Sequence, residues 1–538
     1  MDFEDEEALG ALLDEEAEAD VQEQEHLMVL AALAGLLASS EKPWRGGSAL
    51  GRVKAKNRHC LEGYCMLYSD YFTDALLHVS RRKMGAVLST KKATKMGVDE
   101  VEVVESCMVA PCQETPRRGM WLSPLDLMLV NRGLTPAVYF YPYRSGLSDF
   151  FDVARLKAAM AMDGRLDMDG NGVSALVALV AFYPLAGRLG MDGNDRAEID
   201  CTGEGALLVV ARSDLTIDDL CGFLPSPELR TLFVPRVEDY SPSVLCAVQV
   251  TFFKCGGVAL GTALHHVAVN AISAFHFLQT WSAFSRVGGA AALELPFHDR
   301  TLLRARPPPF VHSDAFSVFC PKLNLSVEPS ETVVTQAFVV SKDQITTLKR
   351  ACIGSDGGRV STFYALSAHA WRCVCVARRL PPDATTRLTF PASVQHSMRP
   401  PLPPGYCGNG IIWLGAAGKV RDVSSSEDLV LVAGQISSAV RRMDDELVRS
   451  AIDYFELTEP APGRMPDTEL RVISWLGMPV YNVEFGWGKP LVMLRAVSER
   501  AGFVYLMDSG KGDGSVRVLM CTEAAILNDF QRLLYARF

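Results

Sequence analysis

The chain has 538 residues, 49% of them hydrophobic, and a formal net charge of −10. This length corresponds to several domain equivalents, and the apolar content suffices for sizeable cores. The acidic balance argues against nucleic-acid binding by the whole molecule, although it leaves room for a local basic patch. The fourteen cysteines are scattered, without zinc-site spacing and without a signal peptide. We therefore expect reduced thiols in a cytoplasmic protein, and no metal.

Residues 1–98 form an N-terminal extension of unusual composition. Residues 1–25 hold twelve Asp or Glu and no Lys or Arg, and the apolar run Leu27–Ala38 is too short to span a bilayer. A basic, glycine-rich run follows at Lys42–His59. We predict that the extension is largely disordered or helical, without a packed core. The basic run could contact nucleic acid, but a solvated loop is the favoured interpretation.

Three stretches of this extension carry a resemblance: EHLMVLAALAGLL, KPWRGGSALGR and LEGYCMLYSDYF. They resemble the N-terminal segment of plant Harbinger-type transposase-derived proteins, whose nuclease part does not follow here. The resemblance indicates a fused fragment or a misplaced start, with Met84 and Met96 as alternative starts.

From Val101 onward, short apolar strands alternate with helical stretches. A β-branched run closed by Pro111 predicts the first strand. Further strands are predicted at 206–210, 244–253, 333–340, 491–496, 503–507 and 516–521, and helices at 151–160, 272–284, 341–351, 362–373, 426–442 and 523–535. The mixture predicts an α/β fold with large, mostly antiparallel or mixed sheets. Pro307–Pro309 indicates a crossover between two halves, and the Asp-Gly segment at 162–172 predicts a surface loop without a calcium-site ligand set.

The stretch VALGTALHHVAVN places His265 and His266 at a strand end, just before a helix. Rigid scaffolds commonly present catalytic groups on such loops. Taken alone, the pair is better explained by one histidine that packs and one that bonds to backbone. A zinc site is disfavoured, because no third ligand can be named.

Three other stretches change this interpretation: FYPLAGRL, YCGN and YNVEFGWGKP. Together with HHVAVNAISAFHFLQTWS, they resemble the ordered motifs of the plant BAHD acyl-CoA-dependent acyltransferases. Those proteins have H-x-x-x-D near the middle and D-F-G-W-G near the C-terminus. The resemblance covers roughly residues 99–538, and TPAVYFYPYRSG and DRTLLRARPPP indicate the hydroxycinnamoyl-transferring branch.

The resemblance implies two chloramphenicol-acetyltransferase-like domains with mixed β-sheets, at 99–305 and 326–538, joined by a crossover at 306–325. The active site would lie in a channel between them, with acyl-CoA as co-substrate and no resident cofactor. By the motif, His266 is the general base and His265 its structural support. Trp475 would donate its indole N–H to the oxyanion.

Other residues receive supporting roles. The resemblance places Thr135 and Tyr139 along the substrate channel. The late motif is a structural loop, made by Glu484, Gly486, Trp487 and Gly488, whose glycines permit a tight turn. Independently of any resemblance, Ser341 and Gln344 form a capping box at a helix start, where Lys342 adds positive charge. An ordinary exposed cap and a site for the CoA phosphates are both consistent with that pattern.

The sequence departs from the family pattern in two respects. Asn270 stands where the family has an aspartate, and Gln395 stands where its arginine partner is expected. We expect these two neutral residues to form a compensated pair. In addition, Gly477 stands where the shikimate-using branch often has arginine. That branch has T-P-S-x-Y and T-S-W where this chain has TPAVY and ISW, so one hydroxyl is lost from each stretch. An amine or small-alcohol acceptor is therefore favoured over an acidic polyol.

We expect a monomeric acyltransferase that moves an aromatic acyl group, such as hydroxycinnamoyl, from CoA to an amine or hydroxyl acceptor. We expect no membrane association and no nucleic-acid partner. One alternative is a catalytically impaired relative that binds acyl-CoA or a partner, as Asn270 and the lost hydroxyls would favour. A second alternative is a DNA-associated fusion protein, favoured only by residues 1–95.

Overall fold

The computed structural model describes residues 100–536, except 145, 147–149, 162–177, 221–223, 241–242, 287–293, 321–323, 326–332, 355–356, 426–428, 459–461, 464 and 497–500. The predicted N-terminal extension, with its Harbinger-like stretches, therefore lies outside the described residues. The Asp-Gly segment at 162–172 lies outside them as well. Residues 93–538 form one structural unit, which contains everything described below.

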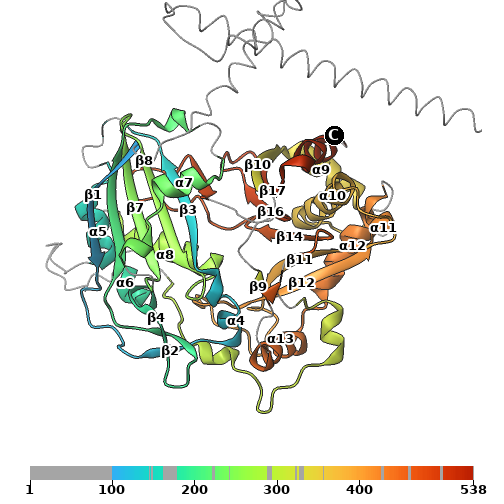
Figure 1. The fold of residues 1–538 in the computed structure, drawn as a ribbon, viewed down its shortest axis with the longest axis horizontal. Coiled ribbons are helices and arrows are strands. Elements are labelled where there is room, and N and C mark those ends of the chain that lie inside the picture. The colour runs from blue at the N-terminus through green and yellow to red at the C-terminus, as the bar shows by residue number, and fades with distance from the viewer. Residues whose placement is uncertain are drawn as a thin grey trace, which may run out of the picture. The chain divides into compact units, whose positions relative to one another are not determined.

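The first sheet of this unit is mixed and has six strands among the described residues (Figure 1). Only the pair β6–β7 is parallel in it, and its other neighbours are antiparallel. In spatial order its strands are β1 (Val101–Val109), β6 (Ala206–Ser213), β7 (Cys246–Phe253), β8 (Val258–His265), β3 (Leu134–Tyr141) and β15 (Val492–Arg495).

The two faces of the first sheet bury different clusters, because successive side chains of a strand point to opposite faces. Val138 and Phe140 pack with helix α7 (Pro227–Phe233) on the outer face. Tyr139 and Tyr141 pack on the inner face, which α5 (Val153–Ala161), α6 (Ala178–Ala181) and α8 (Ala271–Ser285) help to cover. The inner face is the one that faces the second half of the unit.

The second sheet is also mixed and six-stranded in the described part of the chain (Figure 1). Its parallel pairs are β14–β16 and β11–β14. In spatial order its strands are β10 (Val333–Val340), β17 (Val516–Glu523), β16 (Phe503–Asp508), β14 (Glu469–Ser474), β11 (Thr385–Ser393) and β12 (Ile411–Lys419). Its helices are α9 (Lys342–Ala351), α10 (Thr362–Ala377), α11 (Val420–Ser424), α12 (Leu429–Arg441), α13 (Asp445–Leu457) and α14 (Leu527–Tyr535).

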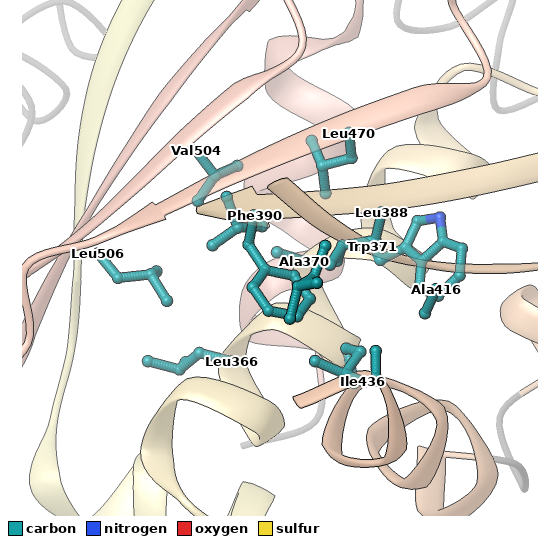
Figure 2. Packing of buried hydrophobic residues seen from close by; sticks show 14 of the residues in the cluster. Leu366, Ala370, Trp371, Leu388, Phe390, Ala416, Ile436, Leu470, Val504 and Leu506 are labelled. Carbon is teal, nitrogen blue, oxygen red and sulfur yellow. The ribbon is translucent and has the colours of Figure 1, made fainter. Parts of the chain in front are cut away.

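Helices α10 and α12 cover one face of the second sheet, as Figure 2 shows. Leu366, Ala370 and Trp371 of α10 meet alternate residues of the strands in one apolar cluster. The strand and α12 members drawn there are Leu388, Phe390, Ala416, Ile436, Leu470, Val504 and Leu506. The strand residues between them lie outside this cluster: Tyr505 packs with residues of the first sheet's inner face, and Trp413 packs with Met128 and Leu129.

The chain crosses between the two halves near its C-terminus. Strand β15 follows the second sheet's β14 in sequence, yet it pairs with β3 at the edge of the first sheet. The preceding residues Val480, Val483 and Phe485 also pack in the first half's inner cluster. The assignment of all residues 326–538 to one C-terminal domain therefore does not describe this segment, which completes the first sheet.

Smaller elements connect the sheets. Helix α4 (Pro124–Leu127) contacts α13. The remaining strands form a three-stranded sheet of β2 (Gly119–Trp121), β5 (Ala197–Asp200) and β4 (Arg188–Met191), and a parallel pair of β9 (Asn324–Leu325) and β13 (Pro462–Gly463). Among the described helices, none combines the length and the apolar character that crossing a bilayer requires.

Two glycines of this fold should respond oppositely to alanine. A Cβ at Gly261 would lie 1.6 Å from the carbonyl oxygen of Phe233, at the end of α7, whereas a Cβ at Gly434 in α12 meets nothing within 4 Å. Gly261→Ala should lower the free energy of unfolding by about 1–3 kcal/mol through overpacking. Gly434→Ala should raise it by about 0.5–1 kcal/mol through helix propensity. Urea unfolding measures both, and similar values would contradict the close approach of α7.

Candidate active site

The histidine pair lies where strand β8 of the first sheet ends. His265 is its last residue, and the backbone N–H of His266 donates to the Gly133 carbonyl at 3.0 Å. The His265 side chain is 6% exposed, and its Nδ1 accepts from the Val267 N–H at 3.3 Å. Burial lowers the pKa of His265 to about 4, so its ring stays neutral at pH 7 and can accept that bond. His266 is half-buried.

A buried arginine holds the loop that follows His266. Arg300, 2% exposed, donates from Nη1 to the Val267 carbonyl at 3.0 Å and from Nη2 to the Ala268 carbonyl at 2.7 Å. Its Nη1 also lies 3.0 Å from Oδ1 of Asp126, which is fully buried in α4. Burial is the largest effect on Arg300 and opposes its charge, but the Asp126 carboxylate, together with Tyr406 and Cys407, gives a net rise of the arginine's pKa.

Asn409 completes this network from the other half of the unit. Its Nδ2 donates to the His266 carbonyl at 2.8 Å, to the Val267 carbonyl at 3.2 Å and to Oδ1 of Asp126 at 3.0 Å. Its backbone N–H donates to the same Asp126 oxygen at 2.9 Å. The carbonyls of residues 266, 267 and 268 are thus all fixed by side chains from distant segments. Neither Asp126 nor Arg300 was predicted as a site residue.

A cavity of about 220 Å³ lies between the inner faces of the two sheets. His266, Thr135, Tyr139, Asn270 and Trp475 all line it, so the structure brings five of the predicted site residues together. The first sheet contributes β3, β8 and β15 to its wall, and the second contributes β11, β12, β14 and β16.

The tryptophan and the arginines of this wall are chemically distinctive. Trp475 is 6% exposed and packs edge-on against Phe275, with ring centroids 5.7 Å apart. Its indole N–H makes no hydrogen bond to any described residue, and the side chain lines the cavity, which leaves the N–H available to a ligand. Arg132 and Arg495 also line the cavity. The glycine at position 477, where the shikimate-using branch often has arginine, therefore does not leave the cavity wall without an arginine.

Comparison with known proteins places this architecture in a family. Residues 99–536 match the model of the transferase family. Putrescine hydroxycinnamoyltransferase 1 of Oryza sativa subsp. japonica is 42% identical over 458 residues, which are 81% of this chain and 98% of that protein. Shikimate O-hydroxycinnamoyltransferase of Nicotiana tabacum is 38% identical over 459 residues, 81% of this chain and 99% of that protein. The chain belongs to the BAHD acyltransferase family.

Solved structures agree on the fold. The crystal structure of vinorine synthase matches with a TM-score of 0.63 at 24% identity, covering 81% of this chain and 98% of that one. The predicted α/β fold with mixed sheets, of the chloramphenicol-acetyltransferase type, is therefore confirmed. By family, the protein is an acyl-CoA-dependent acyltransferase.

Asn270, which replaces the aspartate of the BAHD motif, has a local partner. It is the N-cap residue of α8, and its Oδ1 accepts from the Ser273 N–H at 2.9 Å. No hydrogen bond joins it to Gln395 in the described part of the chain; Gln395 contributes backbone bonds to Ser393 and Leu402 instead. The structure therefore does not support the expected compensated pair. The buried arginine of this site is Arg300, whose partner is Asp126.

The late BAHD motif lies outside the cavity wall, and its Phe485 and Trp487 pack in the apolar cluster of the first half. Gly486 and Gly488 have φ values of +94° and +98°, and a Cβ at Gly488 would lie 2.2 Å from the Arg144 guanidinium carbon. Trp487 packs 4.8 Å from the ring of Phe151. Glu484, in the aspartate position, has no hydrogen bond or ion pair among the described residues. The structure thus gives no backbone-orienting role to this carboxylate.

The predicted capping box is present at the start of α9. Ser341 Oγ accepts from the Gln344 N–H at 3.2 Å, and Gln344 Oε1 accepts from the Ser341 N–H at 2.9 Å. The Lys342 side chain lies beside Gly514, in the loop before β17. Neither Ser341 nor Lys342 lines the cavity. The capping box is confirmed, whereas its use for CoA phosphates stays a prediction.

Two substitutions at Asn270 test its role as a cap. Asn270→Ala removes the acceptor for the Ser273 N–H and should lower the free energy of unfolding by about 1 kcal/mol. Asn270→Asp keeps an acceptor at the positive end of α8 and should retain most of that stability. Urea unfolding of the two variants, alone and combined with Gln395→Arg, checks this. A favourable coupling energy between Asn270→Asp and Gln395→Arg would restore the paired account instead.

Proposed function

We propose that this BAHD acyltransferase transfers a hydroxycinnamoyl group from its CoA thioester to an amine or hydroxyl acceptor, with His266 as general base. The observation that carries the proposal is the position of His266 in the wall of the cavity between the sheets, on a loop whose carbonyls are fixed. The names of the similar proteins support the acyl group, since they include rosmarinate synthase and several hydroxycinnamoyltransferases.

The proposed reaction proceeds in two steps. The acceptor oxygen or nitrogen attacks the thioester carbonyl carbon while His266 takes its proton. The tetrahedral intermediate then collapses, the carbon–sulfur bond breaks, and the CoA thiolate takes the proton back from His266. An amine acceptor must reach the site in its neutral form, because an ammonium has no lone pair for the attack.

The remaining parts of the proposal concern charge and environment. The indole N–H of Trp475 has no hydrogen bond to a described residue, which supports its role as a donor to the oxyanion of the intermediate. We propose acyl-CoA as a co-substrate without a resident cofactor, and a monomer in the cytoplasm. Ser341 and Lys342 at the start of α9 are proposed to meet the CoA phosphates, since helix N-termini favour anions.

Neither alternative finds support in the described residues. The impaired relative rested on Asn270, but this side chain caps α8 as an aspartate would. It also rested on the two lost hydroxyls, but Tyr139 and Trp475 of the same two stretches still line the cavity. The DNA-associated alternative rested on residues 1–95, which lie outside the described residues, as does the Harbinger-like resemblance. The family match begins at residue 99, after these residues.

His266→Ala should lower kcat by about a hundredfold or more, the usual contribution of a positioned general base. The matched variant is His265→Asn, whose Oδ1 can replace Nδ1 as acceptor for the Val267 N–H. It should keep kcat within about threefold. Consumption of p-coumaroyl-CoA, followed with an amine and an alcohol panel, measures both variants. Equal loss of activity in two folded variants would contradict the assignment of roles.

A further inference from the structure

Arg495 has no anionic partner among the described residues, unlike several other buried arginines of this protein. Arg300, Arg471 and Arg378 each form an ion pair with a carboxylate, at 2.9–3.0 Å. Arg495 is half-buried, and its Nε is buried without a hydrogen bond. No hydrogen bond or ion pair links its side chain to any described residue. The guanidinium instead makes a cation–π contact with Tyr505, whose ring centroid lies 5.0 Å from the guanidinium carbon.

The position of Arg495 on the first sheet directs it to the cavity. It pairs with Ala137 of β3, which pairs in turn with Thr262 of β8, so the three form a row across the sheet. All three line the cavity. Thr262 precedes His265 by three residues, so this row lies about 10 Å along the strand from the histidine pair, at about 3.4 Å per residue.

The rest of the wall offers donors but no negative charge. Among the described lining residues there are two arginines, Arg132 and Arg495, and no aspartate or glutamate. Tyr139, which pairs with Met493 and is thus a diagonal neighbour of Arg495, has a fully buried hydroxyl without a hydrogen-bond partner. An alkyl ammonium would meet no counter-ion in this wall and would be repelled by the arginines.

We propose that Arg495 binds a carboxylate of the acceptor, so that the preferred acceptor is an acidic amine or alcohol and not an aliphatic diamine. A planar guanidinium fork matches a carboxylate in two parallel hydrogen bonds. This inference rests on the proposed transferase function and names its acceptor class. It reverses the expectation, drawn from Gly477 and the two lost hydroxyls, that an acidic acceptor is disfavoured. A dicarboxylic acyl donor is the other chemical source of such a carboxylate, but a hydroxycinnamoyl group carries none.

The test compares each acid with its own methyl ester. With p-coumaroyl-CoA as donor, the acceptors are shikimate, 5-hydroxyanthranilate and 4-hydroxyphenyllactate, their methyl esters, and putrescine. The wild-type protein should acylate at least one acid with a kcat/KM at least tenfold above that of its ester and of putrescine. This comparison requires no variant. Faster reaction with putrescine or with the esters would overturn the inference and leave the transferase function standing. No acylated product from any acceptor would overturn the proposed function and this inference with it.

Variants then locate the effect. Arg495→Gln should lower kcat/KM for the preferred acid by about 10–100-fold, the range of a charge-assisted pair. It should leave the ester and the KM for p-coumaroyl-CoA within about threefold. Arg517→Gln is the matched control, because Arg517 is another half-buried arginine of the sheets that does not line the cavity. Equal losses for acid and ester, or a raised KM for the donor, would overturn the assignment. The assignment would also be overturned if Arg495→Gln lowered kcat/KM more for malonyl-CoA as donor than for the preferred acid as acceptor.

Discussion

The buried ion pair of Arg300 and Asp126 is the interaction on which the site depends. Two charges removed from water are costly unless every polar atom around them is satisfied. Here the terminal nitrogens of the guanidinium meet the carboxylate and two loop carbonyls, and the carboxylate also accepts from Asn409 and from Ser123. The Nε of Arg300 is buried without a hydrogen bond among the described residues, so the pair depends on the bonds of its terminal nitrogens. A different conformation of the His266 loop would remove two acceptors from a buried charge, so the pair favours the loop conformation seen here. Because burying the Arg300 charge is costly without these bonds, the Val267 and Ala268 carbonyls are held in place.

This network also joins the two halves of the protein at the candidate active site. Asp126 and Arg300 come from segments around the first sheet, whereas Asn409 precedes β12 of the second sheet. The cavity opens beside the network, and its wall draws strands from both sheets. Strand β15 reinforces the junction, because it leaves the second half in sequence and completes the first sheet. It also carries Arg495 to the cavity.

Much of the fold could be predicted from local pattern. The run 333–340 gives β10 with the predicted bounds, and α8, α9 and α10 lie where apolar periodicity and caps indicate. Strands β11 and β12 escaped prediction because Pro391 interrupts one and glycine and alanine dilute the other. Helix α13 has a clear cap at Asp444, a signal that was overlooked. The histidine pair and the Trp487 loop were recognised because their motifs are contiguous.

The partners within the site could not be predicted, because they are set by long-range contacts. Arg300 and Asn409 both belong to recognised stretches, DRTLLRARPPP and YCGN, but nothing local shows that they converge on the carbonyls after His266. Aligning Gln395 with Asn270 gave a plausible pair that the fold does not form. The charge of the cavity likewise emerges only when β15 is placed beside β3. Its sign could not be deduced from the residues near Gly477.

The most direct test of this account removes the Asn409 amide while its backbone bond to Asp126 remains. Asn409→Ala deletes the donor to the His266 and Val267 carbonyls and should cost about 1–3 kcal/mol of stability. Ile436→Val, in the distant cluster under α12, costs about 1 kcal/mol and serves as the control for stability alone. Steady-state kinetics at a temperature where both variants are folded should give a kcat at least tenfold lower for Asn409→Ala, with little change in the KM for p-coumaroyl-CoA, and an unchanged kcat for Ile436→Val. An Asn409→Ala enzyme that is destabilised but keeps its full kcat would contradict the claim that this network positions His266.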